Sequence, residues 1–396
     1  MTTAKRWLLP DGVEEILPAE AYRLESLRRD LLDLYESWGY ELVITPLIEF
    51  LDSLLVGSSH DLDIHTFKIT DQLSGRMMGI RADITPQAAR IDAHCLNRQG
   101  PVRLCYADNV LHTRPRGLMT SRVPIRIGAE LYGHAGVACD IELVCLMHET
   151  LRRAQVPDLY IVLGHVGIFR ALVAAAELPA DIERSLFEAM QRKAFDEVDT
   201  VLDAKVSDPA LESMLKSLSR LSGDEAVLEQ ALDVFAEAPE TVQKELQDLV
   251  DIVAGVRKRI PGVNLCFDLC ELRGYEYHTG IVFAAYTPRY GRAVAKGGRY
   301  DHIGEVFGRA RPASGFDSDL KILAKLTCKD FVRGQGILAP AGYDDALLGK
   351  IGELRDQGEI VVQWLEETLP DGDQIAELNC DRTLVNDQGK WQVTPI

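Results

Sequence analysis

VPIRIGAELYGH, residues 123–134, and VRLCYADNVLH, residues 102–112, flank the polar, glycine-containing loop RPRGLMTSR at 114–122. Both runs contain β-branched residues and a tyrosine, which favour strands. FKITDQLSGRMMGIRADIT at 67–85 repeats the order of strand, polar turn and strand. This recurring pattern predicts an α+β fold in which an antiparallel sheet is flanked by helices.

Helical periodicity marks other parts of the chain. Leucines and aromatic residues recur at helical spacing over 19–38 and predict a first helix, whereas YELVITPLIE at 40–49 contains a proline and predicts an edge or interface strand. YIVLGHVGIFRALVAAAEL at 160–178 is the longest apolar region and carries His165 and Arg170. A strand that leads into a helix explains it better than a membrane span does.

The spacing of apolar residues becomes helical between about 179 and 258, where they recur every three or four positions. This segment predicts a small acidic helical insertion. β character then returns in VNLCFDLCEL, IVFAAYTP and the GGRYD turn at 297–301, before the helix-like SDLKILAKL. We therefore expect a core over 1–330 and a small C-terminal α/β unit over 331–396, built as β-α-β.

Composition restricts the class of protein. The chain has 396 residues, 46% of them hydrophobic, which is enough for two or three cores. Its 43 basic and 61 acidic residues weigh against binding to a phosphate backbone, which needs clustered lysine and arginine. Eight scattered cysteines without a CxxC pair indicate reduced thiols, and the opening MTTAKRWLLPDGVEE lacks the apolar core of a signal peptide. We expect a soluble, cytoplasmic protein without a membrane partner.

Common catalytic and metal-binding motifs are missing from the sequence. It contains no GxxxxGK[ST], GxGxxG, HExxH or GxSxG pattern. HDLDIH at 60–65 could chelate a metal ion, but no other ligand-spaced cluster supports such a site. A polar surface loop is the favoured interpretation, and we expect neither a metal nor a cofactor.

Three segments carry polar side chains suited to a small ligand. In RADIT at 81–85, Asp83 and Thr85 would share one face of an extended chain and suit an ammonium group. The alternative for Thr85 is a helix N-cap, with proline at the first helical position. In IRIGAELYG at 125–133, Arg126 and Glu130 share one face of a strand. A cross-sheet ion pair on a wet surface is the alternative there.

The third segment is RGYEYHTG at 273–280. Arg273 has a guanidinium that suits a carboxylate, and Tyr277 and His278 have polar tips that suit a small polar ligand. A pocket lined by all three segments would match an amino acid.

Together these segments resemble the catalytic core of histidyl-tRNA synthetase, a class II aminoacyl-tRNA synthetase, from residue 7 to about 326. PDGVEEILP and GYELVITPLIE resemble the opening and motif 1 of that family, RADIT occupies the place of RPEGT, and VLHTRPR through IRIGAE occupies motif 2. RGYEYHTGIVF resembles the histidine-specific segment RGLDYYTGTVF, and KGGRYDHIGEVFGRARPASGF resembles the region that leads into motif 3.

The departures from that family concern ATP and tRNA. Val110-Leu111 replaces the Phe-Arg of motif 2, and Ile322 replaces the arginine of motif 3. Loss of two charge-assisted contacts would weaken ATP binding by about 3–6 kcal/mol, or on the order of 10²–10⁴-fold. Asp319 replaces a glycine and adds repulsion, and only 66 residues follow position 330, fewer than the anticodon-binding domain of the synthetases has. The resemblance therefore implies no amino-acid activation and no tRNA.

The ligand-facing positions are retained better than the ATP-binding ones. By the resemblance, Glu130 occupies the position that reads the imidazole ring, Arg273 and Tyr277 match the family, and His278 replaces a second tyrosine. Asp83 stands for a glutamate and Arg126 for a glutamine. The resemblance thus implies a histidine-binding set made of Asp83, Thr85, Arg126, Glu130, Arg273, Tyr277 and His278.

This combination resembles the regulatory subunits of ATP phosphoribosyltransferase, which are paralogues of histidyl-tRNA synthetase. The resemblance implies a non-catalytic chain that activates a short-form catalytic subunit in the first step of histidine biosynthesis, with histidine as feedback effector. It also implies a self-dimer through motif 1 and a hetero-octamer of four plus four subunits. Two alternatives stay open, a degenerate synthetase-like enzyme that activates histidine with ATP and a stand-alone histidine-binding module.

Overall fold

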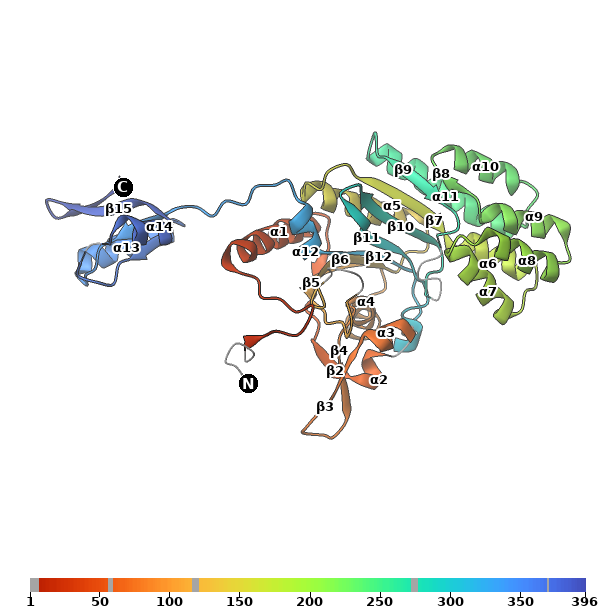
Figure 1. Ribbon diagram of the computed structural model, residues 1–396, viewed down its shortest axis with the longest axis horizontal. Coiled ribbons are helices and arrows are strands. Elements are labelled where there is room, and N and C mark those ends of the chain that lie inside the picture. Colours follow the sequence, from red (N-terminus) through yellow and green to blue (C-terminus); the bar gives the residue numbers. More distant parts are fainter. Residues whose placement is uncertain (1–6, 56–59, 116–120, 272–276, 369) are drawn as a thin grey trace. The chain divides into compact units, whose positions relative to one another are not determined.

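The computed structural model describes residues 7–55, 60–115, 121–271, 277–368 and 370–396 (Figure 1). Contacts divide the chain into two compact units, Met1–Lys329 and Asp330–Ile396. Each unit has its own sheet and its own hydrophobic core.

A nine-stranded sheet forms the centre of the first unit. Its strands pair from β5 to β7 in antiparallel fashion, as predicted, but the pairs β1 with β5 and β7 with β9 are parallel. In spatial order the strands are β1 (Glu41–Leu42), β5 (Val102–Asn109), β6 (Ile125–Tyr132), β12 (Ala313–Asp319), β11 (Tyr290–Arg299), β10 (Ile281–Thr287), β7 (Tyr160–His165), β9 (Leu265–Asp268) and β8 (Ser222–Gly223).

Helices α1 (Pro18–Ser37), α5 (Val137–Arg153) and α12 (Leu320–Leu326) are among those that pack against this sheet. Leu24, Leu27, Leu31 and Leu34 are buried at helical spacing on α1, and each such leucine contributes about 1.5–3 kcal/mol by leaving water. The Tyr35 ring of α1 lies edge-on, 6.2 Å from the Phe316 ring of β12. Because Phe316 and Gly315 point to opposite faces of β12, α1 lies on the face away from Gly315.

A smaller antiparallel sheet lies beside the central one, in the order β2 (Ile48–Phe50), β4 (Met77–Ile80) and β3 (Phe67–Thr70). Helices α2 (Leu51–Leu54), α3 (His60–His65) and α4 (Thr85–Arg90) accompany it, and a π-helix over Ile91–Leu96 continues α4. The strand-turn-strand prediction for 67–85 is confirmed. The prediction of a loop for HDLDIH was wrong, because this segment forms α3. The edge position predicted for 40–49 is confirmed, although the run is divided into β1 and β2, each at the edge of its own sheet.

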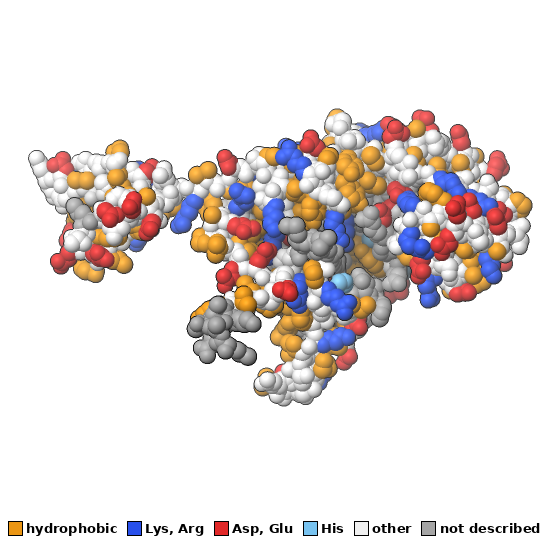
Figure 2. Space-filling view, viewed as in Figure 1, with side chains coloured by type: hydrophobic (Ala, Val, Ile, Leu, Met, Phe, Trp, Pro, Cys, Tyr) orange, Lys and Arg blue, Asp and Glu red, His pale blue; other side chains and the backbone are white. Residues whose placement is uncertain are grey.

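The segment after β7 is helical. As predicted for 160–178, β7 leads directly into α6 (Val166–Ala175). The helices that follow are α7 (Ala180–Gln191), α8 (Phe195–Lys205), α9 (Pro209–Leu218), α10 (Ala226–Val234) and α11 (Glu240–Arg259), and we call α7 to α11 the helical insertion. Its surface mixes acidic and basic side chains (Figure 2). Among the described residues, no helix is long and apolar enough to cross a membrane.

The second unit contains a four-stranded sheet in the order β14 (Val361–Gln363), β13 (Gly336–Ala339), β15 (Cys380–Asp387) and β16 (Lys390–Pro395). Helix α13 (Asp345–Asp356) buries Leu347 and Ile351 in its core, and α14 (Gly372–Glu377) begins with an Asp371–Gln374 capping box. The expected β-α-β arrangement is present as β13, α13 and β14. Sequence reasoning missed α14 and β16, whose apolar residues are few.

Candidate functional site

Glu130 is the central buried acid of the nine-stranded sheet. It lies on β6 with 1% of its surface exposed. Its Oε1 accepts hydrogen bonds from the Thr85 hydroxyl at 3.0 Å and from the Tyr106 hydroxyl at 3.0 Å. Its Oε2 has no hydrogen-bond partner among the described residues. Burial raises the pKa of this carboxyl well above its usual range. Such an oxygen is suited to a polar ligand atom, since buried polar groups are nearly always paired.

Two glycines, Gly315 on β12 and Gly128 on β6 itself, leave room beside this carboxyl. A Cβ atom at Gly315 would lie 1.7 Å from Glu130 Oε2 and 2.1 Å from the Tyr300 hydroxyl, so the two oxygens face one small space. A Cβ at Gly128 would lie 2.8 Å from the Tyr106 hydroxyl. The Tyr300 hydroxyl, like Glu130 Oε2, is buried without a hydrogen-bond partner among the described residues. Two unpaired polar atoms therefore converge above Gly315.

Aromatic rings extend this surface over β11, on the same face of the sheet, because Gly298 of β11 lies opposite Gly315. The His278 ring covers Gly298, where a Cβ would lie 2.7 Å from His278 Nε2. The His278 ring is 4.2 Å from the Tyr277 ring and 6.2 Å from the Tyr300 ring, measured between centroids. His278 is 7% exposed and Tyr277 is 44% exposed. Of the predicted ligand-binding residues in this segment, Arg273 lies outside the described residues.

Charged residues gather at the other end of the same face. Arg126 NH1 lies 3.2 Å from Asp317 Oδ2, and in the register of β6 and β12 Arg126 lies opposite Asp319. Burial lowers the pKa of Arg126, but the nearby carboxyl groups of Asp317, Asp319 and Asp83 outweigh burial. The pKa of Arg126 is therefore raised. The predicted shared face of Arg126 and Glu130 is confirmed, since β6 residues of that parity face Gly315 and Asp317. The alternative there was a cross-sheet ion pair on a wet surface. Arg126 does form an ion pair across strands, with Asp317, but Glu130 is 1% exposed, so this face is buried and not wet.

The RADIT segment approaches from the edge of the sheet. Asp83 Oδ1 accepts the backbone N–H of Thr85 at 3.0 Å, where α4 begins. The N-cap alternative for Thr85 was wrong, because its hydroxyl donates to Glu130 instead. Arg81 is almost fully buried and donates to the carbonyls of Thr45 at 2.7 Å and Asn109 at 2.8 Å. These bonds fix the segment that delivers Asp83 and Thr85.

Positions 111 and 322, where the resemblance implies arginines that hold ATP, carry no cation here. Leu111 and Ile322 are half-buried apolar side chains. Close to Ile322, Asp319 caps α12 by accepting the backbone N–H of Lys321 at 3.0 Å, and burial raises the pKa of Asp319. With Asp317 beside it, this end of the sheet carries two carboxyl groups, and its arginine, Arg126, is paired with Asp317.

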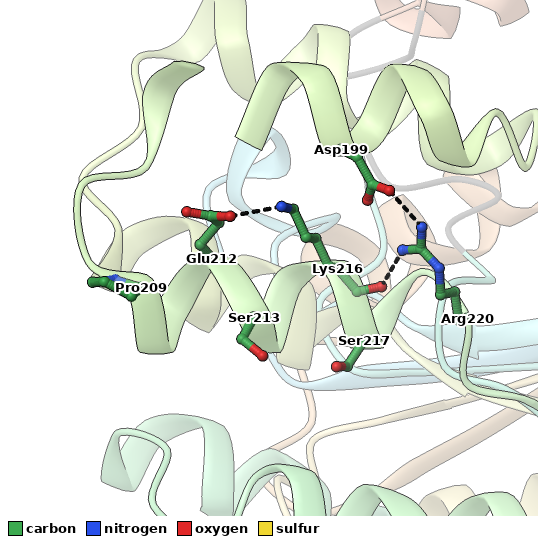
Figure 3. A pocket seen from close by; sticks show the side chains of 7 residues that line it. All are labelled: Asp199, Pro209, Glu212, Ser213, Lys216, Ser217 and Arg220. Carbon is green, nitrogen blue, oxygen red and sulfur yellow. Dashed lines mark hydrogen bonds and ion pairs between the residues drawn. The ribbon is translucent and has the colours of Figure 1, made fainter. Parts of the chain in front are cut away.

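Neither a metal site nor the cavity on the helical insertion matches the arrangement around Glu130. Within the described ranges, no group of three or more histidine, cysteine or acidic residues could hold a metal ion. A cavity of about 360 Å³ lies on the insertion and is lined by α8, α9 and the residues that follow (Figure 3). There Lys216 pairs with Glu212, and Arg220 pairs with Asp199 at 2.7 Å. Its cations are thus neutralised within the insertion.

Sequence reasoning missed Tyr106 and Tyr300. Tyr106 lies opposite Gly128 in the register of β5 and β6, and therefore on the face of Glu130. The strand prediction for 102–112, combined with a register, would have identified it. Tyr300 belongs to the GGRYD motif and extends β11 by one residue into the same space.

Comparisons with known proteins extend over the whole chain. The family described as Histidyl-tRNA synthetase matches residues 12–323, and the family described as ATP phosphoribosyltransferase subunit HisZ C-terminal domain matches residues 334–394. A protein of Stutzerimonas stutzeri called ATP phosphoribosyltransferase regulatory subunit is 54% identical and is covered over 100% of both chains. One of the same name from Chromohalobacter salexigens is 53% identical, again over 100% of both chains.

Solved structures support the fold. A Bacillus halodurans protein described as an ATP phosphoribosyltransferase regulatory subunit/histidyl-tRNA synthetase aligns with a TM-score of 0.82 at 24% identity, covering 97% of this chain and 99% of that one. Histidyl-tRNA synthetase from Nostoc sp. PCC 7120 aligns with a TM-score of 0.76 at 18% identity, covering 98% and 97%. The predicted class II synthetase-like α+β fold is confirmed.

Proposed function

The chain belongs to the family of ATP phosphoribosyltransferase regulatory subunits, and from this membership we propose that it senses histidine in the pocket around Glu130. Its role is regulatory and not catalytic, and its partner is a catalytic subunit of ATP phosphoribosyltransferase.

The observation that carries the proposal is the convergence of Glu130 Oε2 and the Tyr300 hydroxyl above Gly315. Glu130 Oε2 accepts an imidazole N–H, and the Tyr300 hydroxyl serves the same ring as donor or acceptor. The rings of Tyr277 and His278 form an aromatic wall suited to stack with it.

The charged end of the face suits the backbone groups of a free amino acid. Asp83 is the acceptor proposed for the ammonium group, beside the Thr85 hydroxyl that already bonds to Glu130. Arg126 and Arg273 are the proposed partners of the carboxylate. Arg126 exchanges part of its ion pair with Asp317 for that contact.

Selectivity follows from the unpaired polar atoms. A site that must satisfy buried polar groups rejects analogues that lack the matching group, because the protein atoms would then stay unpaired. We expect phenylalanine and leucine to bind at least about 10²-fold more weakly than histidine. Methylation of the imidazole nitrogens should have a similar effect at the nitrogen that faces Glu130.

For the assembly, we propose a self-dimer through the segment of β1 and β2 and a hetero-octamer with four catalytic subunits. Four apolar side chains in this short stretch are exposed, which supports an interface there: Leu42 at 48%, Ile44 at 79%, Leu47 at 49% and Ile48 at 45%. We also propose that tRNA does not bind, since acidic residues outnumber basic ones both in the helical insertion and after residue 330.

The test combines the chain with a purified short-form catalytic subunit. The rate of phosphoribosyl-ATP formation should rise when the chain is added and fall again when histidine is added. Histidine binding to the chain alone is measured by isothermal titration calorimetry, with phenylalanine as the comparison. Stimulation without inhibition by histidine would disprove the sensing proposal, and histidine-dependent exchange of pyrophosphate into ATP would favour the synthetase-like alternative.

A further inference from the structure

We propose that helix α6 transmits the position of the helical insertion to the histidine pocket, with Arg170 and Glu245 as positioning residues. The inference rests on the proposed function and deepens it, because it names the element that regulates the same pocket. It is carried by three sets of contacts, which join α11 to α6, α6 to the segment 277–280, and that segment to Glu130.

The first set joins α6 to the pocket segment through backbone carbonyls. At the start of α6, the backbone N–H of Val166 donates to the Gly280 carbonyl at 2.9 Å. One helical turn later, Arg170 NH2 donates to the His278 carbonyl at 3.2 Å. Two carbonyls of the same short segment are therefore bonded to one rigid helix, and a displacement of α6 carries the segment with it.

The second set joins α6 to the insertion, since α6 packs against α9 and α11. Glu245 of α11 directs its carboxyl group at the first turn of α6, with Oε2 3.5 Å from His165 Nδ1. A Cβ at Gly167 would lie 2.1 Å from that same oxygen, so only glycine admits the approach. His165 is 3% exposed, and burial together with nearby Arg299 lowers its pKa to about 3. The ring is therefore neutral and buried.

The third set joins the segment 277–280 to Glu130. The His278 ring sits on Gly298, which leaves no space for a side chain, and it neighbours the rings of Tyr277 and Tyr300. The Tyr300 hydroxyl faces Glu130 Oε2 above Gly315. The segment is also tied to β11, because the Thr279 backbone N–H donates to the Arg299 carbonyl at 2.8 Å. The aromatic wall thus moves with its own backbone and not as loose side chains.

The consequence is a coupling between two parts of the first unit. If the insertion has two positions relative to the sheet, α6 gives the aromatic wall two positions, and histidine binds one of them better. By linkage, histidine must then bias the insertion by the same factor. Contact of a partner with α9 or α11 would change histidine affinity without touching the pocket.

The first measurement is histidine affinity, by calorimetry, in single variants of the full chain. Arg170→Ala should weaken binding by about 10-fold, because it removes a charged donor from the His278 carbonyl. Arg170→Lys keeps a charged donor and should recover affinity to within about 3-fold of wild type. Glu245→Ala should weaken binding by about 3-fold. Arg184→Ala and Glu229→Ala, at exposed helical positions of the insertion, serve as matched controls and should bind as wild type does.

The second measurement is a double-mutant cycle, which a merely structural role would not satisfy. If α6 is the link, Arg170→Ala combined with Glu245→Ala should bind histidine no more weakly than Arg170→Ala alone. Urea unfolding of each variant checks that the fold is intact, and Arg170→Gln replaces the alanine variant if that one lacks a cooperative transition. Additive losses, or unchanged affinity in both single variants, would overturn the inference. The proposed function survives a failure of this inference if wild type binds histidine and Glu130→Gln does not. If wild type gives no binding heat with histidine, the proposed function and this inference are both overturned.

Discussion

Replacement of Glu130 by glutamine separates histidine binding from stability. Glutamine keeps an oxygen at the position of Oε1, where the Thr85 and Tyr106 hydroxyls donate at 3.0 Å each. Its amide nitrogen takes the position of Oε2, which has no hydrogen-bond partner among the described residues. The substitution therefore preserves the internal bonds and removes only the ionisable group and one acceptor.

Histidine affinity should fall. An amide nitrogen cannot accept an imidazole N–H, and a buried donor left without its acceptor costs about 1–3 kcal/mol. This corresponds to weakening by about 5- to 150-fold. Glu229→Gln, on the exposed surface of α10, is the matched control and should bind histidine normally.

Stability should change in the opposite direction. The pKa of Glu130 is raised by burial in the folded state, so folding disfavours the ionised form. Wild type and variant should be equally stable below the unfolded-state pKa of the carboxyl. Between that pKa and the raised folded-state pKa, wild type should lose about 1.4 kcal/mol relative to the variant for each pH unit. At neutral pH the variant is then the more stable protein.

Calorimetry with histidine and urea unfolding at several pH values test both parts. Wild-type affinity in Glu130→Gln would refute the proposed contact with the ligand. Lower stability of the variant at neutral pH would refute the reasoning about the unpaired oxygen, because it would show that the native charge is favourably compensated.

Two further predictions concern the pocket floor and a surface anchor. Gly315→Ala should abolish histidine binding, because it places a methyl group where the Glu130 and Tyr300 oxygens converge. Gly291→Ala is the control and should bind histidine normally, because its added methyl group would have nothing within 4 Å. Calorimetry measures both variants, and retained binding in Gly315→Ala would place the site elsewhere. Asp30 accepts bonds from Arg153 and Lys329, which together lower its pKa although burial raises it. Asp30→Asn should cost about 1 kcal/mol of unfolding free energy at pH 7, and the difference should vanish as the pH falls through the folded-state pKa of Asp30; a difference that persists at pH 2 would contradict this.

Much of the fold could be predicted from local patterns. The runs around β5, β6, β7 and β10 combine apolar residues with turn signals, and the first helix has its leucines on one face. The strand β12 was missed, because ASGFDSD alternates small and acidic residues instead of apolar ones. Its sequence reflects the polar site that it faces, and a local apolar pattern cannot reveal such a strand.

Site residues could be predicted from the sequence only where their placement depends on the periodicity of their own segment. The face shared by Arg126 and Glu130 follows from strand periodicity alone. The partner of Arg126 does not, because Asp317 lies far away in sequence and meets it through the register of β6 and β12. The same holds for Thr85 at the start of α4. Its hydroxyl donates to the buried carboxyl of Glu130 on β6 and does not cap its own helix. Long-range pairings of this kind depend on packing that no single segment specifies.

The bonds from α6 to the carbonyls of His278 and Gly280 have an evolutionary implication. Because both acceptors are backbone atoms, substitutions at position 278 can alter what the aromatic wall recognises while the helix still holds it in place. Substitutions in α6 can conversely alter the mechanical connection while the recognising side chains stay the same. If the aromatic wall contacts the effector as proposed, effector identity and effector response can diverge independently, each through single substitutions.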